Sequence, residues 1–158
     1  MSLPKTALYT LVVPLALTVA IPWALLRCES APPAWDLGWS RWLGLAPMAL
    51  GAALYLWCAW ELATAGRGTP NPVDPPLALV ARGPYRFVRN PMYVAVNAVI
   101  LGEVLLFRSV WLAKYALGSL VFVQCLVVLW EEPGLRRRHG EAYDAYRAAV
   151  PRWFPRRR

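Results

Sequence analysis

The sequence predicts an all-α integral membrane protein with about four transmembrane helices, the last two as a helical hairpin, plus a short amphipathic C-terminal helix. Two features of the composition support this class: 58% of the 158 residues are hydrophobic, and the mean hydropathy is +0.38. Charged residues make up only 16% of the chain, which is low for a water-soluble domain of this size. We expect a single membrane domain over residues 1–158.

The candidate transmembrane helices are four apolar stretches, at residues 8–26, 42–63, 92–107 and 110–130. A helix needs roughly 20 residues to cross the hydrocarbon core of a bilayer. The third stretch is short and contains Glu103, so we interpret it together with the fourth as a tight hairpin that turns near Arg108 and Ser109. We interpret the first stretch as a retained helix and not a cleaved signal peptide, because its apolar run is long and no small-residue cleavage site follows it.

The basic residues predict the orientation of these helices. In a four-helix topology, thirteen of the seventeen Lys and Arg residues lie on one side, near the N-terminus, in the second loop and in the C-terminal tail. The positive-inside rule makes this side cytoplasmic, so both termini are expected inside, in a bacterial inner membrane. Anionic lipid headgroups are the expected partner for the net charge of +8, and no nucleic-acid motif accompanies it.

A proline-rich loop and a polar tail flank the hairpin on the cytoplasmic side. Four closely spaced prolines in the loop at residues 64–91 exclude regular helix and predict an ordered loop. Pro91 then fits the first turn of the third helix. In the tail at residues 131–158, Tyr143, Tyr146 and Val150 recur at three and four residues, which predicts a short amphipathic helix.

Polar residues within the apolar stretches are expected to find partners. Glu103 and Lys114 lie at similar depth on the two helices of the hairpin, which favours an ion pair, because an unpaired carboxylate is costly in hydrocarbon. Asn97 and Gln124 also lie at matching depth. They fit either a hydrogen bond across the hairpin or contact with a substrate headgroup.

Two adjacent carboxylates, Glu131 and Glu132, end the fourth stretch, where they oppose the negative end of the helix dipole. Positive charge is therefore expected nearby. Two explanations stay open: screening by Arg136 and the arginines of the preceding loop, or recognition of a cationic ligand. The three cysteines are far apart and the chain has one histidine, so no metal site is expected.

Two segments resemble a family of membrane enzymes. Residues 83–93 read G-P-Y-R-F-V-R-N-P-M-Y, and residues 131–155 begin with E-E, contain Y-x-x-Y and end with V-P-x-W-x-P. Both segments are similar to those of the isoprenylcysteine carboxyl methyltransferase and phospholipid methyltransferase superfamily, in the same order and spacing relative to the membrane helices. The resemblance implies a cofactor pocket formed by the loop at residues 64–91 and the tail at residues 131–158.

The resemblance implies S-adenosylmethionine as the cofactor. Carried over by motif position, the cofactor-binding residues are Leu79, Val80, Tyr85, Asn90, Pro91, Tyr93 and Glu131. Glu132 and His139 are the candidate catalytic residues. A base is needed where the acceptor is a lipid amine, which is mostly protonated at neutral pH, and is not needed for a carboxylate.

Three positions depart from the family pattern. Asn90 replaces the usual histidine, and His139 stands where the family usually has phenylalanine. Val127 stands where the eukaryotic prenylcysteine enzymes have an arginine that contacts the substrate. This last departure argues against prenylcysteine carboxylate as the substrate.

The sequence therefore predicts methyl transfer from S-adenosylmethionine to a lipid-borne or apolar substrate, in the manner of isoprenylcysteine carboxyl methyltransferases, at the cytoplasmic membrane face. The expected partners are the bilayer and a lipid or prenylated small molecule, with no nucleic acid and no obligate protein partner. Three alternatives remain: a phospholipid amine N-methyltransferase, an NADPH-dependent sterol-type reductase with a related C-terminal region, and a non-enzymatic membrane subunit.

Overall fold

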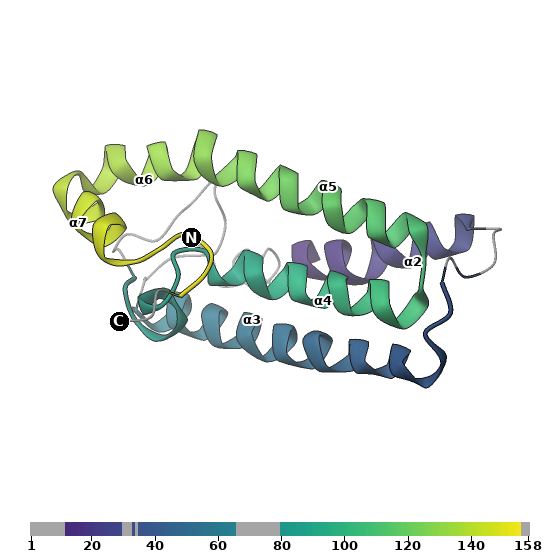
Figure 1. The fold of residues 1–158 in the computed structure, drawn as a ribbon. Coiled ribbons are helices and arrows are strands. Elements are labelled where there is room, and N and C mark those ends of the chain that lie inside the picture. Colours follow the sequence, from purple (N-terminus) through teal and green to yellow (C-terminus); the bar gives the residue numbers. More distant parts are fainter. Residues whose placement is uncertain (1–11, 30–32, 34, 66–79, 156–158) are drawn as a thin grey trace.

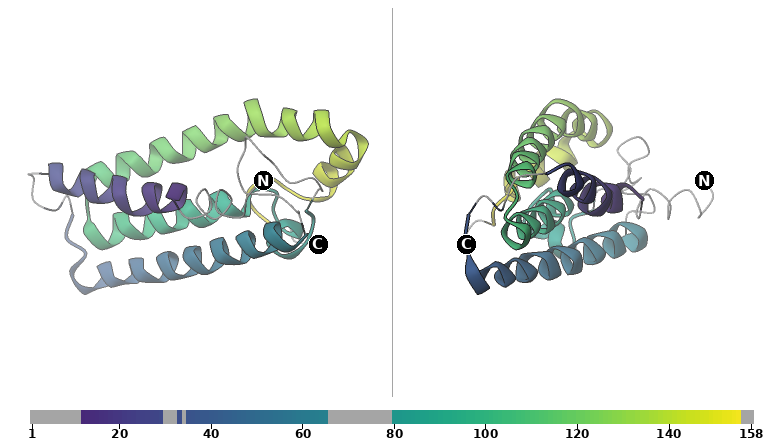
Figure 2. Two further views of the ribbon diagram at one scale, coloured as in Figure 1. Left: turned by 180° about the vertical axis from the view of Figure 1, so that it is seen from behind. Right: turned by 90° about the vertical axis from the view of Figure 1, so that its right-hand side faces the viewer.

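Four long helices run side by side in the computed structural model, which describes residues 12–29, 33, 35–65 and 80–155 (Figure 1, Figure 2). They are the helix Val12–Cys28, whose last part is α2 (Ile21–Cys28), then α3 (Leu45–Ala65), α4 (Pro91–Phe107) and α5 (Val110–Leu126). All regular structure in the described residues is helical. The predicted all-α class is confirmed.

Length and composition suit these helices to a bilayer. The helices Gly38–Thr64 and Val110–His139 are long and apolar enough to cross a membrane, and Val12–Cys28 and Pro91–Phe107 are shorter apolar helices. Large apolar side chains on the outside, such as Leu117 and Phe122, are well exposed in the isolated chain. An apolar outer surface of this kind is favourable in the hydrocarbon of a bilayer and unfavourable in water.

Small residues allow α3 and α4 to pack closely. A Cβ atom added at Gly51 of α3 would lie 2.6 Å from the carbonyl oxygen of Ala95 in α4. Gly44, which precedes α3, and Gly102 of α4 face each other with their backbones in similarly close approach. Small residues at helix contacts let backbones approach and gain van der Waals contact, which is the main source of helix association in lipid. α3 and α4 are the most closely packed pair of helices in the described part of the bundle.

The turn between α4 and α5 confirms the predicted hairpin. Arg108 adopts the left-handed conformation, with φ 56°, and Ser109 caps α5 by accepting a hydrogen bond from the backbone N–H of Leu112 at 3.1 Å. The carboxylate of Glu29 accepts a second bond, from the N–H of Val110, at 3.1 Å. Two of the four free N–H groups of α5 are therefore satisfied by side chains.

The predicted ion pair across the hairpin is wrong, and the hydrogen bond across it, one of two interpretations of Asn97 and Gln124, is not formed among the described residues. The Lys114 ammonium lies 4.6 Å from the ring centre of Trp111, and one carboxylate oxygen of buried Glu103 has no partner among the described residues. Asn97 donates to the backbone carbonyl of Tyr93, four residues earlier on its own helix. Gln124 instead accepts a hydrogen bond from the indole of Trp153, in the tail, at 2.8 Å. Similar depth did not bring these pairs together because the side chains point to different neighbours.

The fourth helix is longer than the sequence indicates. It continues from α5 through a π-helical turn at Val127–Glu131 into α6 (Glu132–His139), so the prediction that it ends at residue 130 is wrong. Pro133 explains the turn, because its missing N–H and its bulky ring disturb the normal helical ladder, and a π turn absorbs the disturbance. Glu131 and Glu132 therefore lie inside a helix, and the argument from the helix dipole does not apply to them.

Gly140, with φ 51°, separates α6 from α7 (Glu141–Ala149). The predicted amphipathic helix is confirmed: Tyr143 on α7 and Val150 just after it are buried, while Arg147 is exposed. Chain direction reverses at Gly140, so that α7 and the tail that follows return toward the ends of α3 and α4 (Figure 1). This end of the bundle, which we call the α6–α7 end, carries the candidate site.

Candidate functional site

The segment before α4 and the tail after α7 contact each other at the α6–α7 end (Figure 1, Figure 2). The backbone N–H of Arg89 donates to the carbonyl of Pro151 at 2.9 Å, and the Asn90 amide donates to the carbonyl of Arg152 at 3.4 Å. The Tyr146 hydroxyl donates to the carbonyl of Tyr85 at 2.6 Å. Three hydrogen bonds between segments about 60 residues apart fix the tail against the start of α4.

Glu132 is the centre of an ion-pair cluster. Arg152 binds its two carboxylate oxygens through Nε at 2.7 Å and a terminal nitrogen at 2.9 Å, and Arg89 approaches at 3.0 Å. The side chains of Arg89 and Glu132 are only 9% and 11% exposed. Arg89 also donates to the hydroxyl of Tyr143 at 3.3 Å. The bond to Glu132 raises the pKa of Arg152. Glu132 therefore joins the loop, α6 and the tail.

Glu131 has a different environment from its neighbour. Its carboxylate accepts a hydrogen bond from the hydroxyl of Tyr93, in the first turn of α4. Within residues 12–29, 35–65 and 80–155, no Lys or Arg forms an ion pair with it. Glu131 is thus a half-buried carboxylate whose described partner is a phenol and not a cation. Such a carboxylate can bind a positively charged group.

Tyr85 lies close to the same carboxylate. It belongs to a short 3₁₀ turn, Gly83–Arg86, which Gly83 enters with φ 51°. Burial raises the pKa of Tyr85, and nearby groups that include Cys58 and Glu131 raise it further. A hydrogen bond joins the side chains of Tyr85 and Cys58. Burial likewise raises the pKa of Tyr146, so both phenols stay neutral. Neutral aromatic rings beside a carboxylate favour a cationic ligand.

The predicted cofactor-binding residues are mostly near one another. Pro91, the first residue of α4, is fully buried, Val80 is buried, and Asn90 precedes α4 at its N-cap position. Tyr85, Tyr93 and Glu131 form the polar part of the site as described above. Leu79 lies outside the described residues. Of the two candidate catalytic residues, Glu132 lies in the ion-pair cluster, and His139 ends α6, away from the contacts that join the loop and the tail.

The sequence does not single out Arg89 and Arg152 as site residues. In the sequence, Arg89 is one of several arginines in the loop, and Arg152 is one of several arginines in the tail. The expected screening of Glu132 by arginine is confirmed, but Arg136 does not supply it, because Arg136 pairs with Asp144 at 3.3 Å. A signal did exist: a buried carboxylate requires a cation, and Arg152 directly follows the proline that ends the α7 segment.

Comparison with known protein families gives a match over most of the described part of the chain. The family described as "Phospholipid methyltransferase" matches residues 39–142, about two thirds of the chain. The matched range includes the segment before α4, both glutamates and His139, and it ends before Tyr143 and Arg152. No curated protein and no solved structure matches the chain.

Proposed function

This chain belongs to the phospholipid methyltransferase family, and we propose that it transfers a methyl group from S-adenosylmethionine to a lipid-borne or apolar acceptor at the cytoplasmic membrane face. Family membership makes it a membrane methyltransferase. The choice of cofactor and acceptor rests on the chemistry of the site residues.

One observation carries the choice of cofactor. Two arginines bind the carboxylate of Glu132. The adjacent carboxylate of Glu131 accepts a hydrogen bond from the Tyr93 hydroxyl and forms no ion pair with a Lys or Arg among the described residues. Two aromatic rings, Tyr85 and Tyr93, lie near Glu131. S-adenosylmethionine carries an ammonium group and a sulfonium beside its own carboxylate, and a protein carboxylate flanked by tyrosines suits the two cationic groups. The residues therefore fit this cofactor.

Each site residue has a defined task in this proposal. Bound S-adenosylmethionine supplies an electrophilic methyl group. Glu131 holds the ammonium group, Tyr85 and Tyr93 offer ring faces to positive charge, and Val80 and Pro91 form apolar walls that exclude water. Leu79, outside the described residues, is proposed for the same wall. Asn90 has an amide for hydrogen bonding but no titratable group, so it orients without exchanging a proton. Positioning is the main demand of an in-line methyl transfer.

The family and Val127 both support a choice of acceptor. The family's description favours a phospholipid amine over an isoprenylcysteine carboxylate, and Val127 lacks the charge that would bind a carboxylate. An amine must lose a proton before it attacks, and Glu132 and His139 are the two candidate bases, each of which a substitution can test. The lone pairs of Glu132 are engaged by Arg89 and Arg152, which favours a positioning role for it.

Cofactor binding by the full chain in nanodiscs tests the proposal. Calorimetry with S-adenosylmethionine is expected to show saturable binding, and Glu131→Gln is expected to weaken it about tenfold or more, the usual effect of losing a charge-assisted hydrogen bond. Glu141→Gln, at an exposed position in α7, is the control because it removes the same charge elsewhere. Equal affinity of both variants and the parent chain would remove Glu131 from the site.

The same preparation discriminates the other functions. Binding of NADPH in place of S-adenosylmethionine would favour a sterol-type reductase, and binding of neither would favour a non-enzymatic subunit. Incubation with methyl-labelled cofactor and host membrane lipids, followed by mass spectrometry, then identifies the acceptor. A label on base-stable headgroup amines supports a phospholipid acceptor, and a base-labile label supports a carboxylate.

A further inference from the structure

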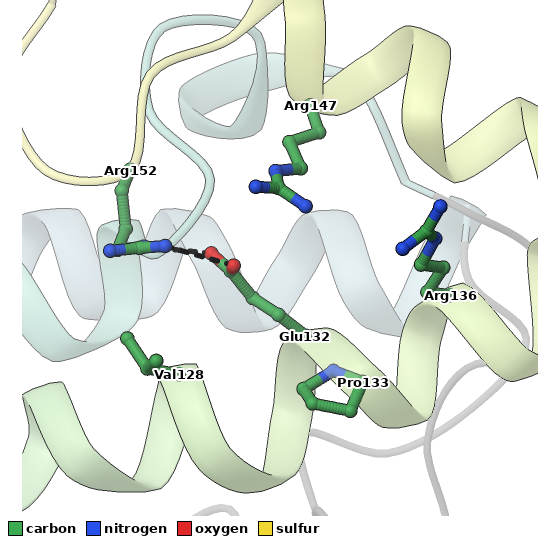
Figure 3. A pocket seen from close by; sticks show the side chains of 6 residues that line it. All are labelled: Val128, Glu132, Pro133, Arg136, Arg147 and Arg152. Atoms are coloured by element: carbon green, nitrogen blue, oxygen red, sulfur yellow. Dashed lines mark hydrogen bonds and ion pairs between the residues drawn. The ribbon is translucent and has the colours of Figure 1, made fainter.

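A pocket of about 280 Å³ lies on another part of the α6–α7 end, and none of the proposed cofactor-binding residues lines it (Figure 3). Its lining residues are Val128, Glu132, Pro133, Arg136, Arg147 and Arg152. Val128, in the π-helical turn, and Glu132 and Arg136, in α6, all line the pocket from the long helix. Arg147 extends toward this face from α7, and Arg152 from the tail (Figure 3).

The charges around the pocket do not cancel. Arg152 and Arg89 both bind Glu132, and Arg136 binds Asp144. Arg147 forms no hydrogen bond or ion pair with any residue that the structure describes, and its charge acts on Glu132 only at longer range. Four guanidinium groups therefore face two carboxylates, which leaves a surplus of two positive charges. A concave site with this surplus attracts an anion of one or two negative charges.

The arrangement of the arginines favours a tetrahedral anion. The three lining guanidinium groups come from α6, α7 and the tail, so their N–H donors approach from different directions (Figure 3). The lone pairs of a carboxylate lie in one plane, and those of Glu132 accept a guanidinium fork from Arg152 and a contact from Arg89. A phosphate group has oxygens that point in several directions and accepts from several arginines at once.

The lining also changes character along the helix. Val128 lies on the side nearer the apolar part of the helix, and Arg136 lies eight residues further along, a rise of about 12 Å. A headgroup phosphate with its attached apolar chain has the same polarity over a similar length. We propose that this pocket binds a phosphate group, with Arg147 as its main free donor. This inference does not depend on methyl transfer.

Titration of the full chain in a phosphate-free maltoside detergent tests the inference. One arm uses short-chain phosphatidylglycerol, a second uses inorganic phosphate, and a third uses a fatty carboxylate as a control of equal charge. Arg147→Gln removes the free donor, whereas Arg137→Gln removes an exposed arginine of α6 that does not line the pocket. Phosphorus NMR follows binding of the phosphate probes, and calorimetry follows the carboxylate.

We expect Arg147→Gln to weaken binding of a phosphate probe about tenfold or more and Arg137→Gln to weaken it less than about twofold. Arg147→Lys keeps the positive charge but lacks the two parallel N–H donors of a guanidinium. Its loss of affinity is expected to lie between the losses of the two glutamine variants. If this pattern appears with phosphatidylglycerol, the source is a lipid headgroup, and if it appears with inorganic phosphate alone, the source is soluble.

Three results would overturn the inference: equal losses in the two glutamine variants, no loss in Arg147→Gln with either probe, or equally tight binding of the fatty carboxylate. Affinity for S-adenosylmethionine is expected to be unchanged in Arg147→Gln. A chain that binds no S-adenosylmethionine still reports on the phosphate probes, so failure of the proposed function and failure of the pocket are distinguishable.

Discussion

Replacing Glu132 with glutamine removes the carboxylate on which the α6–α7 end is built. Arg89 is 9% exposed and loses its charged partner, which leaves an unpaired buried cation. Loss of one partner from a fully buried pair costs about 3–5 kcal/mol. Arg152 is 27% exposed, so water partly replaces the lost contact, and the glutamine carbonyl still accepts one bond. We therefore expect Glu132→Gln to lower the free energy of unfolding by about 2–3 kcal/mol.

Thermal unfolding of the full chain in nanodiscs measures this loss. For a chain of this length, about 1 kcal/mol corresponds to roughly 2–4 °C in Tm, so the expected decrease is roughly 4–12 °C. Asp144→Asn is the matched control because it breaks the exposed pair with Arg136, whose side chains are 64% and 43% exposed, and such pairs contribute about 0–1 kcal/mol. An equal Tm decrease in the two variants, or none in Glu132→Gln, would refute the argument that burial gives this cluster its strength.

Four further predictions concern other parts of the chain. Gly83→Ala is expected to cost about 1–2 kcal/mol of stability in the same assay, because its φ is 51° and a Cβ would lie 2.6 Å from the carboxylate of Glu61. Gly134→Ala, where a Cβ meets no atom within 4 Å, is expected to be neutral or stabilising. The rate of amine methylation by His139→Phe is expected to stay within about twofold of the rate of the parent chain at each pH from 6 to 9. A tenfold loss of rate relative to the parent chain would identify this histidine as a base. A reporter fused after the last residue is expected to be cytoplasmic, and a periplasmic signal would contradict the proposed orientation.

Apolar stretches and prolines in the sequence predicted the main helices well. Hydropathy located α3, α4 and α5, Pro91 marked the start of α4, and Arg108 with Ser109 marked the hairpin turn. These are local signals, because each depends on residues within about one helical turn. The amphipathic spacing of α7 is local in the same sense.

The sequence failed where two distant segments had to be matched. Depth along the hairpin suggested that Glu103 pairs with Lys114, yet depth fixes only one coordinate, and the rotation of each helix about its own axis decides which side chains meet. Gln124 illustrates this, since its partner is Trp153 in the tail and not a residue of α4. The extension of the fourth helix to His139 was also missed, because the apolar stretch ends before Glu131, whereas a π turn lets the helix continue into polar residues.

The adjacent glutamates show why site chemistry required the structure. Apart from the family resemblance, which assigns Glu131 to the cofactor and Glu132 to catalysis, the sequence does not show which of the two meets an arginine and which meets a ligand. Successive residues of an α-helix point about 100° apart, so two neighbours on one helix necessarily face different surroundings. Glu132 faces the tail and the segment before α4, where Arg152 and Arg89 neutralise it, and Glu131 faces Tyr93 on α4. Glu132→Gln is therefore expected to affect Tm first, and Glu131→Gln to affect cofactor affinity first. Because the two variants remove the same group from neighbouring positions, an effect of both on the same quantity would show that the two carboxylates serve one site.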